Sequence, residues 1–255
     1  MRSGMILGMA MVTIVWGALA LPAQVQDFGY SGEIGPEHWA DLRPEWGTCS
    51  TGQEQSPVDL GGVARRLRRS ARPVIDYPPT RGKIFNNGHT IEVETEGEDA
   101  LTLDGERYRL VQLHFHSPSE HTVQGRGYDM EMHLVHRSDA GRIAVLGIFL
   151  QRGPDSGAFD AIGEALPDDI DVRHAIEDPL DLRTLLPATV SSSIRRYAGS
   201  LTTPPCSEDV SWLVATEPVL ISDELMARFV ERVRYNARFV QRFVRSTGAV
   251  TDRSR

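Results

Sequence analysis

Three histidines in two short segments have the spacing of a metal site. His114 and His116 are separated by one residue in QLHFHSPSEH, and His133 lies in EMHLVH. Because alternate residues of an extended strand point to the same face, His114 and His116 share a face if their segment is a β-strand. Antiparallel pairing of the two segments would add His133. The result would be three neutral nitrogen ligands and an open fourth position, the arrangement of a catalytic zinc site.

Two polar residues fit as partners of these imidazoles. Gln112 and Glu131 lie two residues before His114 and His133, on the same strand faces. Histidines that bind a metal usually donate their second ring N–H to such an acceptor, whereas a bare His-x-His pair is equally compatible with surface or buried structural histidines. The opposite strand faces are expected to be core, and they consist of Val111, Leu113 and Phe115 in the first segment and Met132, Leu134 and His136 in the second.

A different metal site is compatible with part of the same pattern. His114, His116, Glu120 and Gly127 fit the first motif of cupins, jelly-roll proteins that bind iron or manganese, and Glu120 would then be a metal ligand. The chain has no glycine-proline-glycine-histidine companion motif downstream, and His133 would lack its usual setting. The three-histidine zinc site is therefore the preferred hypothesis.

The segments around these histidines are patterned as a meander of strands. LTLDGERYRL places Asp104 and Gly105 between two alternating runs, which is a strong hairpin signal, and SDAGR separates EMHLVH from the apolar run IAVLGIFL. Helical patterns occur at about 156–166 and from Ser222, which is placed as an N-cap. Residues 27–57, rich in Gly, Pro and Trp, are expected to be irregular.

Composition predicts one exported globular domain. Of the 255 residues, 40% are hydrophobic and 24% are charged, which suits a single domain with a full core. Residues 1–20 combine a basic start, an apolar stretch and a small-x-small ending, so they are interpreted as a secretory signal peptide that precedes a mature domain of residues 21–255. A retained membrane anchor is the less favoured alternative. The net charge of −8 disfavours nucleic acid as a partner.

The two cysteines of the chain are expected to pair. Cys49 and Cys206 would meet an oxidising compartment after export, which favours a disulfide over two free buried thiols. The bond would close a loop of more than a hundred residues, a constraint of about 4 kcal/mol or more in the chain-entropy model. It would also fix the LTTPP segment that precedes Cys206.

Taken together, these motifs resemble the alpha class of carbonic anhydrases over nearly all of the mature chain. The motifs that carry the resemblance are YSGEIGPEHW, QSPVDL, NNGH, QLHFHSPSEH, EMHLVH, AVLGIFL and GSLTTPP, in family order. The serine-proline after His116 and the two cysteines are similar to the exported bacterial branch. The resemblance implies a mixed α/β, strand-rich single domain on a large twisted, mainly antiparallel central β-sheet with peripheral short helices.

The resemblance also implies an enzyme, a zinc lyase that reversibly hydrates carbon dioxide to bicarbonate and a proton. Zinc-bound hydroxide would attack carbon dioxide, and a histidine would shuttle the released proton. A side esterase activity is expected from the same hydroxide. The implied partner is the small-molecule substrate, with no nucleic acid and no stable membrane span after signal removal. Periplasmic or secreted localisation is expected, and homodimers are common among the similar bacterial enzymes.

Matched position by position, the family pattern makes the three histidines zinc ligands. Thr202 becomes the gatekeeper, whose hydroxyl accepts from the zinc-bound hydroxide and donates to an ionised Glu120. His89 in NNGH becomes the proton shuttle. The remaining roles fall to residues behind the ligands (Gln112, Glu131 and the backbone carbonyl of Asn236), around the substrate pocket (Val135, Val145, Leu201, Thr203, Val210 and Trp212) and in a water network (Tyr30, Asn86 and Asn87).

One position departs from the family pattern, and one further alternative stays open. Phe239 in NARFVQ replaces the usual proline, so a different local backbone path and C-terminal packing are expected there, while Asn236, Arg238 and Gln241 remain in register. The alternative is a non-catalytic carbonic-anhydrase-like binding module. Such modules typically lack one or more ligand histidines, and this chain retains all three.

Overall fold

Alternating apolar and polar runs form the strands of one large sheet. The computed structural model describes residues 27–61, 65–66, 72–154 and 157–242. The strands are β1 (Arg65–Arg66), β2 (Val74–Asp76), β3 (Thr80–Asn86), β4 (Ile91–Thr95), β5 (Ala100–Leu103), β6 (Glu106–His116), β7 (Met130–Ser138), β8 (Ile143–Arg152), β9 (His174–Leu180), β10 (Ile194–Gly199) and β11 (Val210–Ile221).

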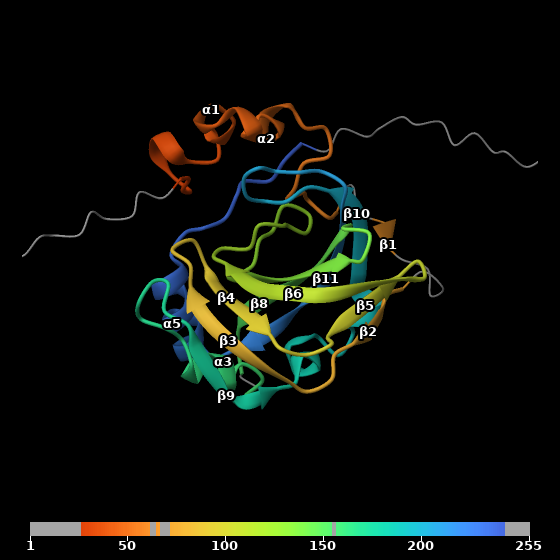
Figure 1. Ribbon diagram of the computed structural model, residues 1–255, viewed down its shortest axis with the longest axis vertical. Coiled ribbons are helices and arrows are strands. Elements are labelled where there is room, and N and C mark those ends of the chain that lie inside the picture. The colour runs from red at the N-terminus through yellow and green to blue at the C-terminus, as the bar shows by residue number, and fades with distance from the viewer. Residues whose placement is uncertain (1–26, 62–64, 67–71, 155–156, 243–255) are drawn as a thin grey trace, which may run out of the picture.

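Within the described residues these eleven strands join in a single sheet. Its main path runs β1-β10-β11-β8-β7-β6-β4-β3-β9, and β5 pairs with both β6 and β2 beside that path (Figure 1). All pairs are antiparallel except the parallel pair β11 and β8. The prediction of a mainly antiparallel, strand-rich fold is confirmed.

Short helices lie at the periphery of the sheet. They are the α-helices α1 (Trp39–Leu42), α2 (Thr48–Thr51), α3 (Asp160–Glu164), α4 (Val190–Ser193) and α5 (Asp223–Val233) and the 3-10 helices η1 (Gly32–Ile34), η2 (Pro44–Trp46) and η4 (Leu182–Leu185). In Figure 1, α1 and α2 lie together at the top of the view, and α3 and α5 lie at the lower left. None of the described helices is long and apolar enough to span a bilayer.

The helix predictions differ in accuracy. Ser222 caps α5 as predicted, because its hydroxyl accepts a hydrogen bond of 3.2 Å from the backbone N–H of Leu225. The pattern at 156–166 produces only the five-residue helix α3, with Gly163 inside it and a buried face against α5. The irregular segment predicted at 27–57 contains two short α-helices and two 3-10 turns.

The two sheet faces have different environments. One face carries the main core, in which Leu113 and Phe115 of β6 pack with Phe229 of α5. A second cluster on the other side of β8 and β11 contains Val145 and Trp212. The strands are therefore apolar on both sides at the centre of the sheet, and the polar residues on the second side stand out as candidates for function.

A β-bulge in β6 corrects one sequence prediction. The pairing of β6 with β7 shifts between Leu110, opposite His136, and Gln112, opposite Val135, so Val111 is an extra residue in the ladder. Val111 is 50% exposed, and the prediction that it faces the core is wrong. The alternation restarts after the bulge, which leaves Leu113 and Phe115 buried as predicted.

The turns that connect the central strands match their sequence signals. Asp104 and Gly105 both adopt positive φ (52° and 83°) between β5 and β6, as a tight hairpin turn requires. Gly141, also at positive φ, lies in the turn between β7 and β8. The predicted signal peptide, residues 1–20, lies outside the described residues.

Candidate metal centre

Strand pairing brings the three histidines together. His114 of β6 is the register partner of His133 of β7, and His116 follows two residues later on the same face. The ring centroids lie 4.9 Å apart for His114 and His116, 5.2 Å for His114 and His133, and 4.6 Å for His116 and His133. One nitrogen from each ring lies within 4.8 Å of the other two, a separation that a single ion can bridge.

Each ring uses its other nitrogen to bond a fixed acceptor. His114 donates from Nδ1 to Gln112 Oε1 (2.8 Å), and His116 donates from Nδ1 to the backbone carbonyl of Asn236 (2.8 Å). His133 donates from Nε2 to Glu131 Oε1 (3.0 Å). Each hydrogen bond fixes the tautomer, so Nε2 of His114, Nε2 of His116 and Nδ1 of His133 are left to bind an ion.

The protonation of the rings also suits metal binding. Desolvation and the neighbouring imidazoles lower the pKa of His114 well below its usual value, and desolvation lowers the pKa of His116. Neutral imidazole is the form that ligates a metal. Nε2 of His116 is buried and has no hydrogen-bond partner among the described residues, an arrangement that folded proteins rarely tolerate. The donor set and this unpaired nitrogen fit zinc.

Behind His133, Glu131 organises a buried hydrogen-bond network. Its carboxylate accepts from the backbone N–H groups of Glu120 (3.0 Å) and His121 (2.8 Å) and from Nδ1 of His121 (2.7 Å). The charges of nearby histidines and these hydrogen bonds hold the pKa of Glu131 well below its usual range despite burial. Gly147 faces His133 across the sheet, where a Cβ would lie 2.9 Å from Glu131 Oε1. Glycine is therefore needed for this close approach.

The network extends through residues for which the sequence predicted no function. Nε2 of His121 lies 2.6 Å from the Tyr197 hydroxyl, which in turn bonds Ser56 Oγ at 2.8 Å. His121 and Ser56 occur in the family-like motifs QLHFHSPSEH and QSPVDL, so the sequence could have identified both as candidate site residues. Tyr197 lies in no such motif. Glu131 binds both His121 and His133, so these three residues form one hydrogen-bond network.

Glu120 lies beside the free nitrogens of His116 and His133, but it makes no hydrogen bond to Thr202, its predicted partner, in the described part of the chain. Its Oε1 accepts from the backbone N–H of Arg238 (2.8 Å), and its Oε2 lies 3.5 Å from His116 Nε2. Oε2 is buried and unpaired among the described residues. Thr202 is buried too, but no hydrogen bond joins it to Glu120 in the described part of the chain. The gatekeeper contact therefore stays a prediction.

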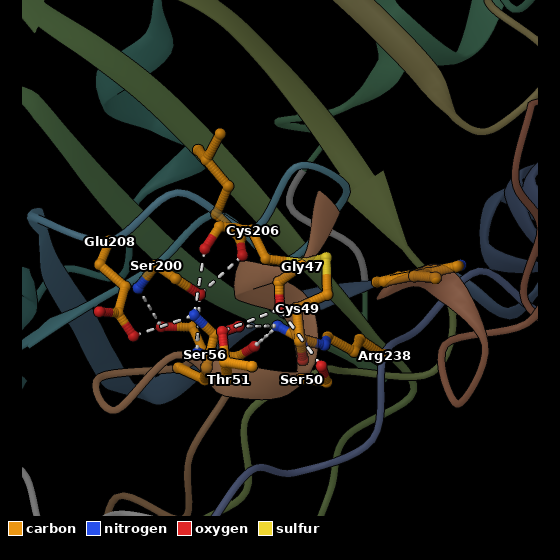
Figure 2. Close-up of a disulfide and its surroundings, with 12 residues drawn as sticks. Gly47, Cys49, Ser50, Thr51, Ser56, Ser200, Cys206, Glu208 and Arg238 are labelled. Atoms are coloured by element: carbon orange, nitrogen blue, oxygen red, sulfur yellow. Dashed lines mark hydrogen bonds between the residues drawn. A yellow bond between two sulfur atoms is a disulfide. The ribbon is translucent and has the colours of Figure 1, made fainter. Parts of the chain in front are cut away.

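The segment that carries Thr202 is cross-linked to the N-terminal region. Cys49 and Cys206 form a disulfide with a Cα–Cα distance of 5.0 Å, which confirms the predicted pairing. Figure 2 shows Arg238 beside this bond, where its guanidinium donates to the carbonyls of Cys49 (2.9 Å) and Ser56 (2.8 Å). The disulfide and Arg238 thus hold α2, the segment before Cys206 and the backbone that contacts Glu120 in one place.

The predicted shuttle, His89, lies on a turn between β3 and β4. Its ring is half-buried and stacks on Phe28 with a centroid distance of 4.1 Å. Burial lowers the pKa of His89, with a smaller opposing effect of Asp27. A hollow of about 510 Å³ adjoins His89, and its lining includes Tyr30 and Asn236.

The amides predicted to order water are engaged by this turn. Asn86 Oδ1 accepts from the backbone N–H of Gly88 (2.9 Å). Asn87 Oδ1 accepts from the backbone N–H groups of His89 (3.0 Å) and Thr90 (2.9 Å). Both side chains therefore shape the turn that carries His89.

Five of the predicted pocket residues gather in one apolar cluster. Val145, Val210 and Trp212 are buried there, and Val135 and Leu201 pack against them. The Trp212 ring lies 4.8 Å from the His133 ring. The backbone carbonyl of Thr203, the sixth residue, accepts from the N–H of Cys206 (2.9 Å).

Comparison with known proteins settles the family. The family described as eukaryotic-type carbonic anhydrase matches residues 34–254. The chain belongs to the carbonic anhydrase family. Carbonic anhydrase of Nostoc sp. is 40% identical over 223 residues, which cover 86% of this chain and 84% of that protein. Carbonic anhydrase of Klebsiella pneumoniae is 38% identical, and the match covers 82% of this chain and 84% of that one.

Solved structures agree with this assignment. The alpha-carbonic anhydrase of Thermovibrio ammonificans, solved with the inhibitor sulfanilamide, matches with a TM-score of 0.79 at 40% identity and covers 85% of this chain and 95% of that chain. A hyperthermostable carbonic anhydrase from a hydrothermal vent chimney matches with a TM-score of 0.78 at 38% identity, covering 85% and 96%.

Family membership decides between the functional hypotheses drawn from the sequence. This carbonic anhydrase is an enzyme of the lyase class that hydrates carbon dioxide, so the resemblance drawn from the motifs is confirmed. The cupin hypothesis is wrong, because the histidines lie on a mixed sheet of the carbonic anhydrase fold. The non-catalytic binding module is likewise set aside.

Proposed function

We propose that this carbonic anhydrase uses one zinc ion held by His114 Nε2, His116 Nε2 and His133 Nδ1. The observation that carries the proposal is the set of three fixed tautomers, each leaving one nitrogen toward a common point. Zinc bound there would lower the pKa of water and supply a hydroxide nucleophile near neutral pH, a property for which carbonic anhydrase is itself the standard example. Gln112, Glu131 and the Asn236 carbonyl would keep the rings in place.

Glu120 and Thr202 are proposed to orient the nucleophile. Glu120 is fixed by the backbone N–H of Arg238, and its free Oε2 is a suitable acceptor for the Thr202 hydroxyl. A hydroxyl that donates to a carboxylate can only accept from its other neighbour, which would direct the oxygen lone pair of the nucleophile toward carbon dioxide. Glu120 must stay ionised and outside the ligand set for this role.

The apolar cluster is proposed to receive the substrate. Carbon dioxide is small, uncharged and apolar, so an apolar wall next to the histidines binds it without competition from ordered water. The contact of Trp212 with the His133 ring joins this wall to the ligands. The proposed wall consists of Val135, Val145, Leu201, Val210 and Trp212. Thr203 is proposed as a further pocket residue.

His89 is proposed to carry the released proton to solvent. Its ring is half-buried and borders an open hollow, which is also lined by Asn236, the residue whose backbone carbonyl accepts from His116. A histidine titrates close enough to neutrality to accept and release a proton in each cycle. Tyr30, Asn86 and Asn87 are proposed to shape the water path between the site and His89.

We propose that the protein is exported, on the basis of its disulfide and its N-terminal sequence. A structural disulfide forms in oxidising compartments, and residues 1–20 have the pattern of a signal peptide. We therefore place the mature domain, residues 21–255, in the periplasm or the medium. Homodimerisation and hydrolysis of activated esters are further properties to measure.

Metal analysis combined with a carbon dioxide hydration assay tests the proposal. The purified protein should contain one zinc, lose hydration activity on chelation and regain it with zinc. His89→Ala should lower kcat about ten- to a hundredfold while leaving kcat/KM nearly unchanged, and imidazole buffer should restore turnover. A folded, zinc-loaded protein without hydration activity would refute the zinc mechanism, and an unchanged kcat in His89→Ala would refute the shuttle.

A further inference from the structure

Asn236 uses all of its polar groups in hydrogen bonds. Its backbone N–H donates to the carbonyl of Ser117 (3.1 Å), and its backbone carbonyl accepts from His116 Nδ1 (2.8 Å). Its side-chain Oδ1 accepts from the N–H of Ser117 (2.8 Å), and Nδ2 donates to the carbonyls of Phe115 (2.9 Å) and His89 (3.0 Å). The residue is 1% exposed, so each of these bonds is made away from water.

These contacts join two parts of the catalytic site. Phe115 and His116 are the last two residues of β6, the strand of His114 and His116, and Ser117 directly follows them. His89 lies on the turn between β3 and β4, 147 residues away from Asn236 in the chain. The side-chain amide of Asn236 therefore bridges the ligand strand and the turn that carries the proposed proton shuttle.

The position of the His89 ring depends on its backbone. Its imidazole makes no hydrogen bond among the described residues, and its ring contact is the stack on Phe28. The backbone of the turn is held internally by Asn87, and Thr90 Oγ1 bonds the Phe115 backbone. From outside the turn, the side-chain amide of Asn236 donates a hydrogen bond to the backbone carbonyl of His89.

We propose that the side chain of Asn236 is a positioning residue for proton transfer. Its carboxamide fixes the distance between His89 and the ligand His116, and hence the length of the water path between them. This function is separate from that of its backbone carbonyl, which orients His116 in any variant. The inference rests on the proposed role of His89 as the shuttle.

Two variants of the full-length, zinc-loaded protein test the side chain alone. Asn236→Ala removes the amide, and Asn236→Asp keeps an acceptor for the Ser117 N–H but loses both donors. We expect kcat to fall about tenfold, with a much smaller change in kcat/KM and with rescue by imidazole, because misplacement of a reacting group by about 1 Å is costly. Zinc content should stay at one per chain.

Hydrogen exchange gives a readout that does not depend on activity. In the metal-free protein, the amides of His89 and Thr90 should exchange faster in Asn236→Asp than in the wild type, because the turn has lost a tether. Tyr77→Phe is the matched control, since it removes a buried hydrogen bond to His136 (2.7 Å) that involves no residue of the turn. This variant should lower stability without changing KM, which is the ratio of kcat to kcat/KM.

A double-mutant cycle with His89→Ala decides the inference. If Asn236 acts through His89, Asn236→Asp should lower kcat no further in the His89→Ala background. Equal loss of kcat and kcat/KM, or an undiminished effect in that background, would overturn the positioning role. A His89→Ala single variant with unchanged kcat would instead show that the shuttle assignment itself is wrong, so the two failures are distinguishable. If Asn236→Ala does not fold, Asn236→Asp carries the same comparison.

Discussion

Glu131 Oε1 lies 3.0 Å from Nε2 of His133, and the same oxygen lies 2.7 Å from Nδ1 of His121. One buried carboxylate oxygen therefore fixes the tautomer of His133, the third proposed ligand, and connects it through His121 to the Tyr197 and Ser56 hydroxyls. The nitrogen of His133 that is left free to bind an ion is Nδ1, in contrast to Nε2 in His114 and His116, because Glu131 occupies the other side of the ring.

Weakening this carboxylate should lower the affinity for zinc. Glu131→Gln keeps the size of the side chain but removes the charge that the His133 and His121 rings bond, so we expect zinc affinity about 10- to 100-fold lower. Competition with a fluorescent chelator measures the change. Glu106→Gln is the control, since Glu106 bonds Arg142 at the partly exposed start of β6, and it should bind zinc like the wild type. Equal affinities in Glu131→Gln and Glu106→Gln would show that the Glu131 carboxylate does not support zinc binding.

Substitution of Glu120 should separate orientation from ligation. Glu120→Gln removes the ionised acceptor proposed for Thr202, so kcat/KM for hydration should fall about a hundredfold. The metal content should stay at one zinc per chain, because the proposed ligands are the three histidines. Elemental analysis beside the rate measurement checks both. Loss of zinc in this variant would mean that Glu120 is a ligand and that the proposed hydrogen bond to Thr202 is not its function.

The metal-free protein should lose stability in mild acid through His136. This histidine is buried, its Nε2 accepts from the Tyr77 hydroxyl (2.7 Å), and burial lowers its pKa from 6.5 to about 4. The unfolded chain therefore binds a proton at a higher pH than the folded protein does. The free energy of unfolding should fall as the pH drops from 6.5 to about 4, by up to about 1.4 kcal/mol per pH unit for this one group.

The matched variant for this pH effect is His136→Gln. It replaces the titrating ring with a neutral amide, so the slope between those pH values should become smaller, although the variant is less stable overall. Urea unfolding at several pH values, in the presence of chelator, measures both slopes. The same slope in both proteins would show that His136 does not contribute to the acid sensitivity.

The disulfide should contribute strongly to stability. Cys49 and Cys206 are separated by 157 residues, and in the chain-entropy model a cross-link over such a loop constrains the unfolded state by about 5 kcal/mol. The double variant Cys49→Ser, Cys206→Ser should therefore lose most of that amount in urea unfolding. A loss below about 1 kcal/mol would indicate that the unfolded chain is already restricted or that the bond is strained.

Local alternation in the sequence was enough to predict how the three histidines come together. The i and i+2 spacing of His114 and His116, with His133 on a neighbouring strand, corresponds to the observed pairing of β6 and β7. The bulge at Val111 was not predictable from alternation, because an extra residue leaves no mark in a regular apolar pattern. The helix at 156–166 is short because a weak local propensity needs tertiary packing to extend it.

The network behind the ligands depends on long-range contacts, which a single sequence does not show. Ser56, His121 and Tyr197 meet through hydrogen bonds that span 76 and 141 residues of chain. The second function of Asn236 is hidden for the same reason, since its amide bonds His89 147 residues away. The sequence motifs marked the ligands and their nearest acceptors, whereas the fold was needed to identify the residues that hold the two halves of the site together.

An anomalous difference map of the zinc-loaded crystal, measured on both sides of the zinc absorption edge, would show directly whether the three histidines hold the metal. We predict one zinc ion within about 2.0–2.1 Å of His114 Nε2, His116 Nε2 and His133 Nδ1, with its fourth position open to solvent. An ion bound by Glu120 or by Nε2 of His133, or no ion among the three rings, would contradict this prediction.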